Sequence, residues 1–332
     1  MDAAATPVSD LVFRDHPMDT ARVFPTPNAV AAWDDPLHYV SLGNDLYWWM
    51  SADIKVDALE GATPSYQMPV SQVEYIRYET QLQHRQAQRG RVNLVYVQVQ
   101  NRGYLPAANV RVKLLYADAS AGLPDLPADF WSAFPADSAD TSVWRPIGAT
   151  QTIASAAPGI PTILEWDWTP PAGAATHSCL LAVMDSTSDP IPEAAKVLTV
   201  GTLVPGEKRV TLKNLHLIDP AAASSASIRF TASSRKVQTI RVIPHTRNVP
   251  NLTFAFEPKF VEKVKLWEGF KRQSLPKAKT GRLQFVVPKE GVTLAIKPAA
   301  LAAGEQPASF SVIQYEGETI VGGSTFVVRP KR

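Results

Sequence analysis

The sequence has little cysteine, little charge and no long apolar run. One cysteine among 332 residues, Cys179, excludes a disulfide within the chain and a zinc site made of cysteines. Cys179 lies in the apolar run Ser178-Cys-Leu-Leu-Ala-Val183, which predicts a buried strand and an inert thiol. No run approaches the ~18 apolar residues of a membrane-spanning helix. The N-terminus has neither the basic nor the apolar region of a signal peptide, so we expect cytoplasmic synthesis, with any export by a non-classical route.

Sequence motifs of catalysis and cofactor binding are absent as well. The chain has no Gly-x-Ser-x-Gly, no Gly-x-x-x-x-Gly-Lys, no Gly-x-Gly-x-x-Gly and no His-Glu-x-x-His, and its six histidines are isolated. Asp185–Asp189 and Asp137–Asp140 offer carboxylates for calcium, but the turn-forming tendency of Asp and Ser explains both segments at lower cost. We therefore expect no cofactor, no metal and no enzymatic activity.

What the chain does have is proline and aromatic residues. It contains 28 prolines against 17 glycines, together with 8 Trp, 9 Tyr and 12 Phe. Prolines throughout exclude a coiled coil, and so many aromatic side chains exclude a disordered protein because they need a core. Residues 1–45, rich in Pro, Asp and Ala, predict an extended arm that crosses other surfaces.

The net charge of +2 is the difference of two larger values. Residues 1–200 hold 12 Lys and Arg and 22 Asp and Glu, a net −10, whereas residues 201–332 hold 21 and 9, a net +12. The sign changes near Val200–Arg209, where Gly and Pro predict a connector between two domains. This asymmetry suggests a polyanion or the acidic half of a neighbouring subunit as partner, or neutralisation of the two halves within one chain.

Strand patterns in the acidic half are clear. Val95, Val97 and Val99 alternate with polar or aromatic residues, which predicts a strand with one buried and one wet face before the turn Asn101–Gly103. Further strands are expected at 110–116, 162–168 and 178–185. The segment 74–90 fits either a helix or a long polar hairpin loop.

Four of these segments carry a family resemblance: Val95-Tyr-Val-Gln-Val-Gln-Asn-Arg-Gly103, Ala108-Asn-Val-Arg-Val-Lys-Leu-Leu115, Leu164-Glu-Trp-Asp-Trp-Thr-Pro-Pro171 and Leu180-Leu-Ala-Val-Met-Asp185. Together they resemble CARDB-type domains, which are bacterial Ig-like sandwiches. The resemblance covers about Val92–Glu193 and implies a fold rather than a function. The chain departs from the family pattern at Ala194 and Ala195, where the family usually has paired Asn.

The basic half predicts a second sandwich, because many short strands follow one another at near-even spacing. The expected strands are 208–218, 226–232, 236–243, 251–257, 260–267, 282–287, 291–297, 308–315 and 319–329. In the alternative arrangement, a strand from the N-terminal arm completes the sheet of this second sandwich. The predicted fold class is all-β, with an arm at 1–45, an acidic Ig-like sandwich at 46–200 and a basic sandwich at 201–332.

Two groups of residues are candidate binding sites. Tyr47, Trp48 and Trp49 form an aromatic cluster that is either a stacking platform for a sugar or base, or a buried plug at the end of a sandwich. The second group is a basic patch for docking on an acidic protein surface, with nucleic acid the less favoured partner. Its members are Lys259, Lys263, Lys265, Lys271, Arg272, Lys277, Lys279 and Arg282.

From these features we predict a non-catalytic structural or adaptor subunit of a larger bacterial assembly. It associates with itself or with an acidic protein surface through its oppositely charged domains. The alternatives are a carbohydrate-binding module, a hydrolase built from scattered residues, and an accessory or toxin component exported without a classical signal.

Overall fold

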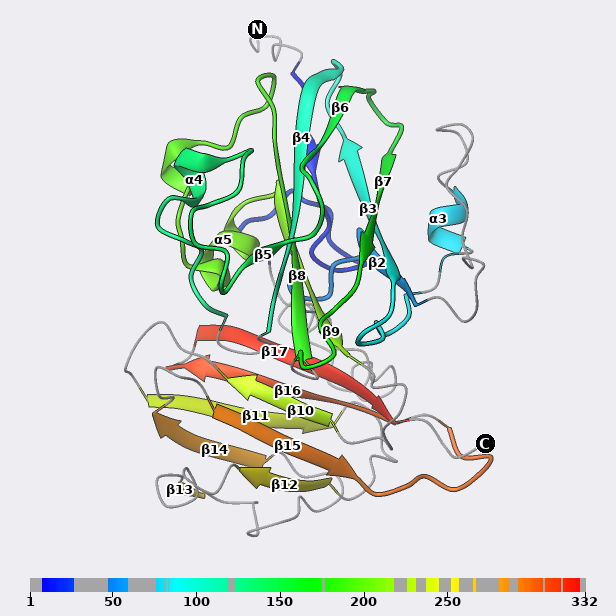
Figure 1. Cartoon of the computed structure of the whole chain (residues 1–332), viewed down its shortest axis with the longest axis vertical. Coiled ribbons are helices and arrows are strands. Elements are labelled where there is room, and N and C mark those ends of the chain that lie inside the picture. The colour runs from blue at the N-terminus through cyan, green and yellow to red at the C-terminus, as the bar shows by residue number, and fades with distance from the viewer. Residues whose placement is uncertain are drawn as a thin grey trace, which may run out of the picture.

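The structure is a computed structural model of the whole chain, and it is all-β, with two sandwiches stacked along its length (Figure 1). It describes residues 8–26, 47–58, 76–80, 82, 84–118, 123–174, 177–217, 226–230, 237–244, 252–256, 265–266, 281–286, 292–306, 308–317 and 319–328. Among these residues, no helix has both the length and the apolar character that crossing a membrane requires.

The first sandwich has two antiparallel sheets. One contains β1 (Leu11–Val12), β2 (Ile54–Ala58), β3 (Asn93–Asn101) and β7 (Thr162–Trp168). The other contains β4 (Ala107–Ala117), β5 (Arg145–Pro146), β6 (Gln151–Ala156), β8 (His177–Asp185) and β9 (Val210–His216). The strands expected at 110–116, 162–168 and 178–185 are confirmed as β4, β7 and β8.

The second sandwich stacks a three-stranded sheet against a five-stranded one (Figure 1). The order of the first is β10 (Ala226–Phe230), β15 (Val292–Pro298), β12 (Leu252–Phe256). The order of the second is β13 (Lys265–Leu266), β14 (Gly281–Val286), β11 (Val237–Pro244), β16 (Ala308–Glu316), β17 (Thr319–Val328). Each of these strands falls within or beside a segment that the sequence predicts, and of the predicted strand 260–267 the structure describes only β13.

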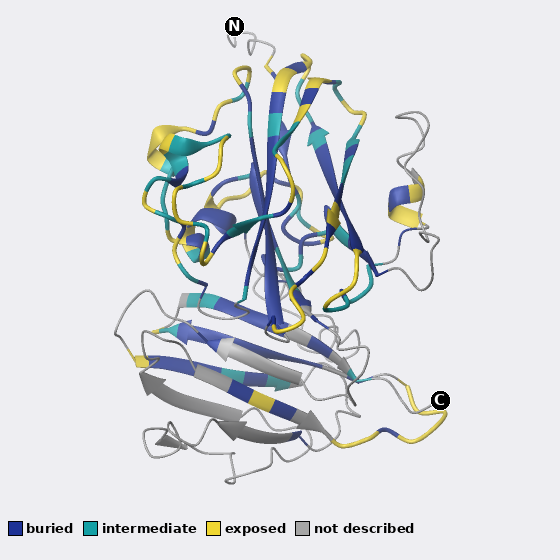
Figure 2. Ribbon diagram, viewed as in Figure 1, coloured by how far each residue is buried: buried dark blue, intermediate teal, exposed yellow. Residues whose placement is uncertain are grey.

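One apolar core fills the space between the two sheets of the first sandwich. It takes Val95, Val97 and Val99 from β3 and the inward faces of β4, β7 and β8. The opposite face of β3, however, is not wet, so that part of the sequence prediction is wrong: Tyr96 and Gln98 are buried (Figure 2). The reason is that the short helix α3 (Ile76–Thr80), in the segment predicted as helix or loop, places Tyr78 against this face in a separate apolar cluster.

A second core lies on the outer face of the β4–β8–β9 sheet, so this sheet is buried on both sides. It is covered by α4 (Phe130–Ala133), by α5 (Val200–Gly206) and by Tyr47, Trp48 and Trp49. Ile313 and Tyr315 of β16 belong to the same cluster. The two sandwiches therefore share an apolar contact.

The sequence prediction for the region around residue 200 needs two corrections. Val200–Arg209 is not an open connector, because α5 buries Val200, Leu203 and Val204 in the outer core. The strand expected at 208–218 is formed, but as β9 it pairs with β8 of the first sandwich. Its side chains reach both apolar cores, Leu212 the outer and Leu215 the inner, which is why it completes this sheet. The division of the chain into domains stays a prediction.

Of the predicted arm, the structure describes residues 8–26. Leu11 pairs with Asn101 of β3 and Val12 pairs with Gln100. Leu11 and Phe13 are buried in the inner core. This stretch therefore folds onto its own first sandwich and does not complete the sheet of the second. Residues 27–45 of the predicted arm lie outside the described part.

Candidate functional site

The N-terminal segment, residues 8–15, is held by side chains from distant parts of the chain. The backbone N–H groups of Asp10, Leu11 and Arg14 donate to side-chain oxygens of Asn101, Asp189 and Asp53, at 3.0, 2.7 and 2.6 Å. A fourth N–H, that of Phe13, donates to the Lys208 carbonyl at 2.7 Å. Because β1 is only two residues long, these contacts replace most of the ladder that would otherwise fix the segment.

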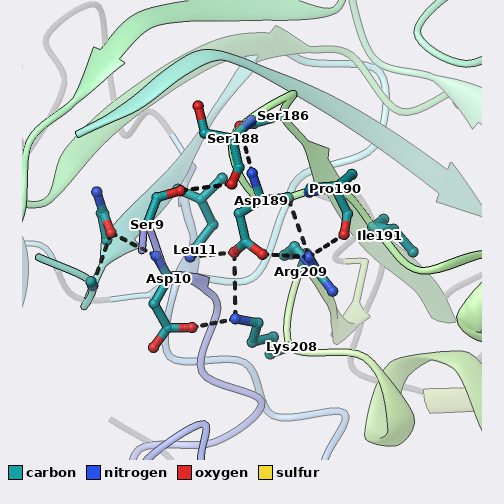
Figure 3. A network of polar contacts seen from close by, with 12 residues as sticks. Ser9, Asp10, Leu11, Ser186, Ser188, Asp189, Pro190, Ile191, Lys208 and Arg209 are labelled. Atoms are coloured by element: carbon teal, nitrogen blue, oxygen red, sulfur yellow. Dashed lines mark hydrogen bonds and ion pairs between the residues drawn. The ribbon is translucent and has the colours of Figure 1, made fainter. Parts of the chain in front are cut away.

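Asp189 is the centre of one polar network (Figure 3). Its Oδ1 accepts from Arg209 Nη1 at 2.8 Å, and its Oδ2 faces Lys208 Nζ at 3.4 Å; Lys208 also pairs with Asp10. The buried Arg209 guanidinium is completed by Glu207, at 2.6 Å from Nε and 2.9 Å from Nη2. Two cations and three carboxylates are thus paired where the N-terminal segment meets the start of β9.

Asp185 and Asp189 bound the loop in which the sequence offers carboxylates for calcium. Asp185 accepts the Ile191 N–H at 3.0 Å and faces Arg111 at 3.3 Å, and Ser186 Oγ accepts the Ser188 N–H at 3.0 Å. The turn interpretation is therefore confirmed, and the carboxylates are occupied by cations and N–H groups. Across the described residues, no group of three or more His, Cys, Asp or Glu is arranged to hold a metal ion.

Arg14 and Asp53 form a second network on the other side of the segment. Arg14 Nε and Nη2 donate to the fully buried Asp53 carboxylate at 2.8 and 2.5 Å, and Nη2 also reaches Glu79 at 2.6 Å. Burial acts to lower the pKa of Arg14, but Asp53 and Glu79 outweigh it and raise the pKa. Burial raises the pKa of Asp53, and Arg14 opposes this shift. Removing one member of the pair would leave the other in the interior without its main partner.

Further titratable groups gather beside this pair. Lys213 Nζ donates to the Ser51 carbonyl at 2.5 Å, and burial together with nearby Lys55 lowers the pKa of Lys213 to about 7. Burial and then Asp19 raise the pKa of Asp15 well above its ordinary value. Burial, then Lys213 and Lys55, lower the pKa of His84. Perturbed groups of this kind are typical of active sites, but also of structural ion-pair networks.

The chemistry of the cluster favours the structural interpretation. Ser51, whose main-chain carbonyl accepts from Lys213, is fully buried, and its hydroxyl donates to the Arg14 carbonyl at 3.0 Å, so the hydroxyl is not aimed at a substrate. A pocket among the described residues lies elsewhere, between Lys113, Phe130 and Trp144, and its volume of about 10 Å³ holds roughly one water molecule. Binding sites for small molecules are about thirty times larger or more.

Cys179 is buried in β8, as predicted. Its thiol donates to Asn214 Oδ1 at 2.9 Å, and burial raises its pKa well above the ordinary value. A protonated, buried thiol is unreactive.

The aromatic cluster is not a stacking platform, and this alternative is corrected. Tyr47, Trp48 and Trp49 are 2, 3 and 1% exposed. Tyr47 stacks on Trp49 with ring centroids 4.5 Å apart, and Trp48 meets Trp49 edge-on at 5.1 Å. With their faces covered by each other and by the outer core, the rings cannot receive a sugar or base. The rings are buried, but against the outer face of the β4–β8–β9 sheet rather than at the end of a sandwich.

Trp49 also marks where the sandwiches meet. A Cβ on Gly323 of β17 would lie 2.6 Å from Cζ2 of Trp49, so only glycine fits there. Asn214 Nδ2 donates to the Gly323 carbonyl, and the rings of His177 and Phe326 are 4.8 Å apart. The joint is therefore close-packed, with the Trp49 ring lying directly against the backbone of Gly323.

Most of the predicted basic patch lies outside the described residues. Only Lys265 and Arg282 fall in described strands, opposite Gln284 in β14 and Arg241 in β11. The other members, Lys259, Lys263, Lys271, Arg272, Lys277 and Lys279, are not described. The patch stays a prediction.

The sequence did not point to Asp53 and Arg209 as anchoring residues, and it pointed to Asp189 only as a carboxylate of the Asp185–Asp189 loop. The cations that approach this carboxylate, Lys208 and Arg209, come from a separate part of the chain.

Comparison with solved structures gives CARDB domains among the matches. The chain is similar to the CARDB domain of a Pyrococcus furiosus protein, solved as a crystal structure in complex with di-metal ions, with 13% identity over 40% of this chain and 82% of that chain and a TM-score of 0.23. The solution structure of that domain gives 12% identity over 50% of this chain and 94% of that one, with a TM-score of 0.23. The resemblance noted in the strand motifs thus recurs in the structural comparison.

A further match is red sea bream transglutaminase, with 12% identity over 78% of this chain but only 33% of that enzyme, and a TM-score of 0.24. No protein-family model matches the chain. No curated protein matches it either. At these values a likeness reaches no further than the fold.

Proposed function

We propose that this protein is a non-catalytic structural or adaptor subunit that associates through its two oppositely charged halves. Because β9 pairs within the first sandwich, the halves are better divided at residue 217. Residues 1–217 then hold 15 Lys and Arg and 23 Asp and Glu, a net −8, and residues 218–332 hold 18 and 8, a net +10. The charge separation survives the revised boundary.

The observation that carries the proposal is the separation of charge between the two halves, a net −8 against a net +10. Among the described residues, the ion pairs named above have both members between Asp10 and Arg209, and apolar groups such as Trp49, Ile313 and Tyr315 meet the second sandwich. Most Lys and Arg of residues 218–332 lie outside the described part. Oppositely charged surfaces on two parts of a molecule favour association between copies.

Light scattering over a salt series tests the proposal. We expect association at about 20 mM salt and tens of micromolar protein, and dissociation at about 500 mM salt, where the screening length falls to a few ångströms. A protein that is monomeric at low salt would overturn it.

A matched pair of variants then locates the contact. Changing Lys263, Lys271, Lys277 and Lys279 together to Gln removes charge from the basic patch, and changing the same four to Arg keeps it. We expect the Gln variant to associate at least about tenfold more weakly at low salt and the Arg variant to behave as the wild type. Equal weakening of both variants would show that charge is not the cause.

A further inference from the structure

The β3–β4 and β6–β7 turns lie at the end of the first sandwich furthest from the second, and exposed residues gather there (Figures 1 and 2). Tyr104 is 82% exposed, Val8 56%, Leu105 48% and Ile160 36%. We call these four residues the distal tip. Large apolar side chains gathered at one end of a sandwich, rather than scattered singly, indicate an interaction surface.

The backbone of the distal tip is fixed by one buried side chain, Asn101. Its Oδ1 accepts the N–H groups of Asp10 and Gly103, both at 3.0 Å. Its Nδ2 donates to the carbonyls of Leu105 and Ala156 at 2.8 and 2.9 Å. Asn101 therefore uses both of its donors and accepts twice, and so ties the N-terminal segment to both turns.

Backbone contacts complete this arrangement. The Tyr104 N–H donates to the Val8 carbonyl at 2.9 Å, and the Gly159 N–H donates to the Asn101 carbonyl at 2.8 Å. Gly103 packs so closely on residues 8–10 that a Cβ would lie 2.2 Å from the Val8 carbonyl oxygen. A surface held in this way loses little conformational entropy when it binds.

The distal tip is also free of charge. Residues 103–110 and 146–164, which include both turns, contain no Asp, Glu, Lys or Arg. Of the flanking charges, Arg102 donates to the Thr20 carbonyl and Asp10 is paired with Lys208. A polyanion or an anionic membrane would need cations here. The surface that fits is apolar and uncharged.

We infer that the distal tips of two copies of this chain pair with each other about a two-fold axis. An uncharged apolar surface is complementary to itself, because two-fold pairing brings no like charges together, and two-fold dimers are the commonest symmetric assemblies. The inference deepens the proposed self-association and rests on it for the choice of partner. Four side chains form far less than the roughly 800 Å² per partner of a standard interface, so the dimer is weak.

Salt separates this contact from the charge-driven one. Association through opposite charges weakens as salt screens them, whereas apolar burial is strengthened by salts such as sulfate. A protein that does not associate in low salt therefore counts against the charged contact. A protein that does not associate in high salt counts against the contact between distal tips.

Sedimentation equilibrium in about 1 M sodium sulfate, from roughly 10 µM to 1 mM protein, measures the tip contact with the charges screened. We expect a monomer–dimer equilibrium for the wild type and at least about tenfold weaker dimerisation for Tyr104→Ser and Leu105→Ser. Val143→Ser is the matched control, since Val143 is 44% exposed and lies outside the tip. A wild type that stays monomeric, or a control as weak as the tip variants, overturns the inference.

Cysteine cross-linking gives an independent readout. The native Cys179 is buried, so Ala108→Cys provides an accessible thiol beside the distal tip while keeping all four tip side chains, and Val143→Cys provides one elsewhere. Under mild oxidation we expect a disulfide-linked dimer at least tenfold faster from Ala108→Cys, because tip-to-tip pairing brings the two copies of the β3–β4 turn together. Equal rates from both variants contradict tip-to-tip pairing.

Discussion

The N-terminal segment of the first sandwich and the joint between the two sandwiches are held by different kinds of contact. Within the first, buried carboxylates and guanidinium groups fix the N-terminal segment, as Arg14 with Asp53 and Arg209 with Asp189 show. At the joint, Trp49 packs on the backbone of Gly323, and Ile313 and Tyr315 enter the outer core. The contrast teaches that, among the described residues, ion pairs anchor the N-terminal segment, whereas apolar packing and the hydrogen bond from Asn214 to Gly323 join the two sandwiches.

The largest expected effect comes from Asp53→Ala. It leaves the Arg14 guanidinium in the interior without its main partner, and breaking a buried ion pair typically costs about 3–5 kcal/mol of unfolding free energy. Urea unfolding of the full chain measures the loss.

Glu193→Ala is the control for this variant, because Glu193 is 88% exposed in its pair with Lys196 and its removal should cost less than about 1 kcal/mol. Replacing both buried members, Arg14→Met with Asp53→Leu, should cost less than Asp53→Ala alone. A loss for Asp53→Ala no larger than that for Glu193→Ala would mean that buried charge does not hold the first sandwich.

Gly323→Ala tests the joint. The added Cβ would lie 2.6 Å from Cζ2 of Trp49 and 3.0 Å from the Val312 carbonyl oxygen, and overpacking of this kind costs about 1–3 kcal/mol. Thermal unfolding followed by tryptophan fluorescence should show an earlier transition. Gly206→Ala is matched to it, since a Cβ there meets nothing within 4 Å. If both variants unfold alike, the joint is looser than the described contact.

The smallest effect concerns pH and Lys213. With a pKa of about 7 in the folded protein and an ordinary value of about 10.4 in the unfolded chain, the unfolded state binds more protons between these pH values. Stability from this group therefore rises as pH increases from 7 to 10. Lys213→Met should reduce that rise by about 1 kcal/mol between pH 7 and pH 8, measured by urea unfolding at these two pH values. An unchanged pH dependence would show that the charge on Lys213 is not penalised by burial.

Much of the fold followed from the sequence, because alternation of apolar side chains reports which faces of a strand are buried. Val110, Val112 and Leu114 and the continuous apolar run of β8 were located in this way. The sequence predicted that the face of β3 carrying Gln98 is exposed to water. This prediction was wrong because Arg14, which contacts Gln98, comes from 84 residues earlier in the chain. The candidate sites were harder: the same aromatic run, Tyr47–Trp49, suits a platform or a plug, and only its neighbours decide.

The sequence by itself determined the all-β class, the positions of most strands and the separation of charge, since these depend on local periodicity and on counting. Only the tertiary structure decided that β9 belongs with β8, that residues 8–15 fold back onto their own sandwich, and that the joint is apolar. Each of these results is a contact between residues far apart in the chain. Such contacts are selected by shape, burial and hydrogen-bond satisfaction over the whole molecule, and no local pattern records them.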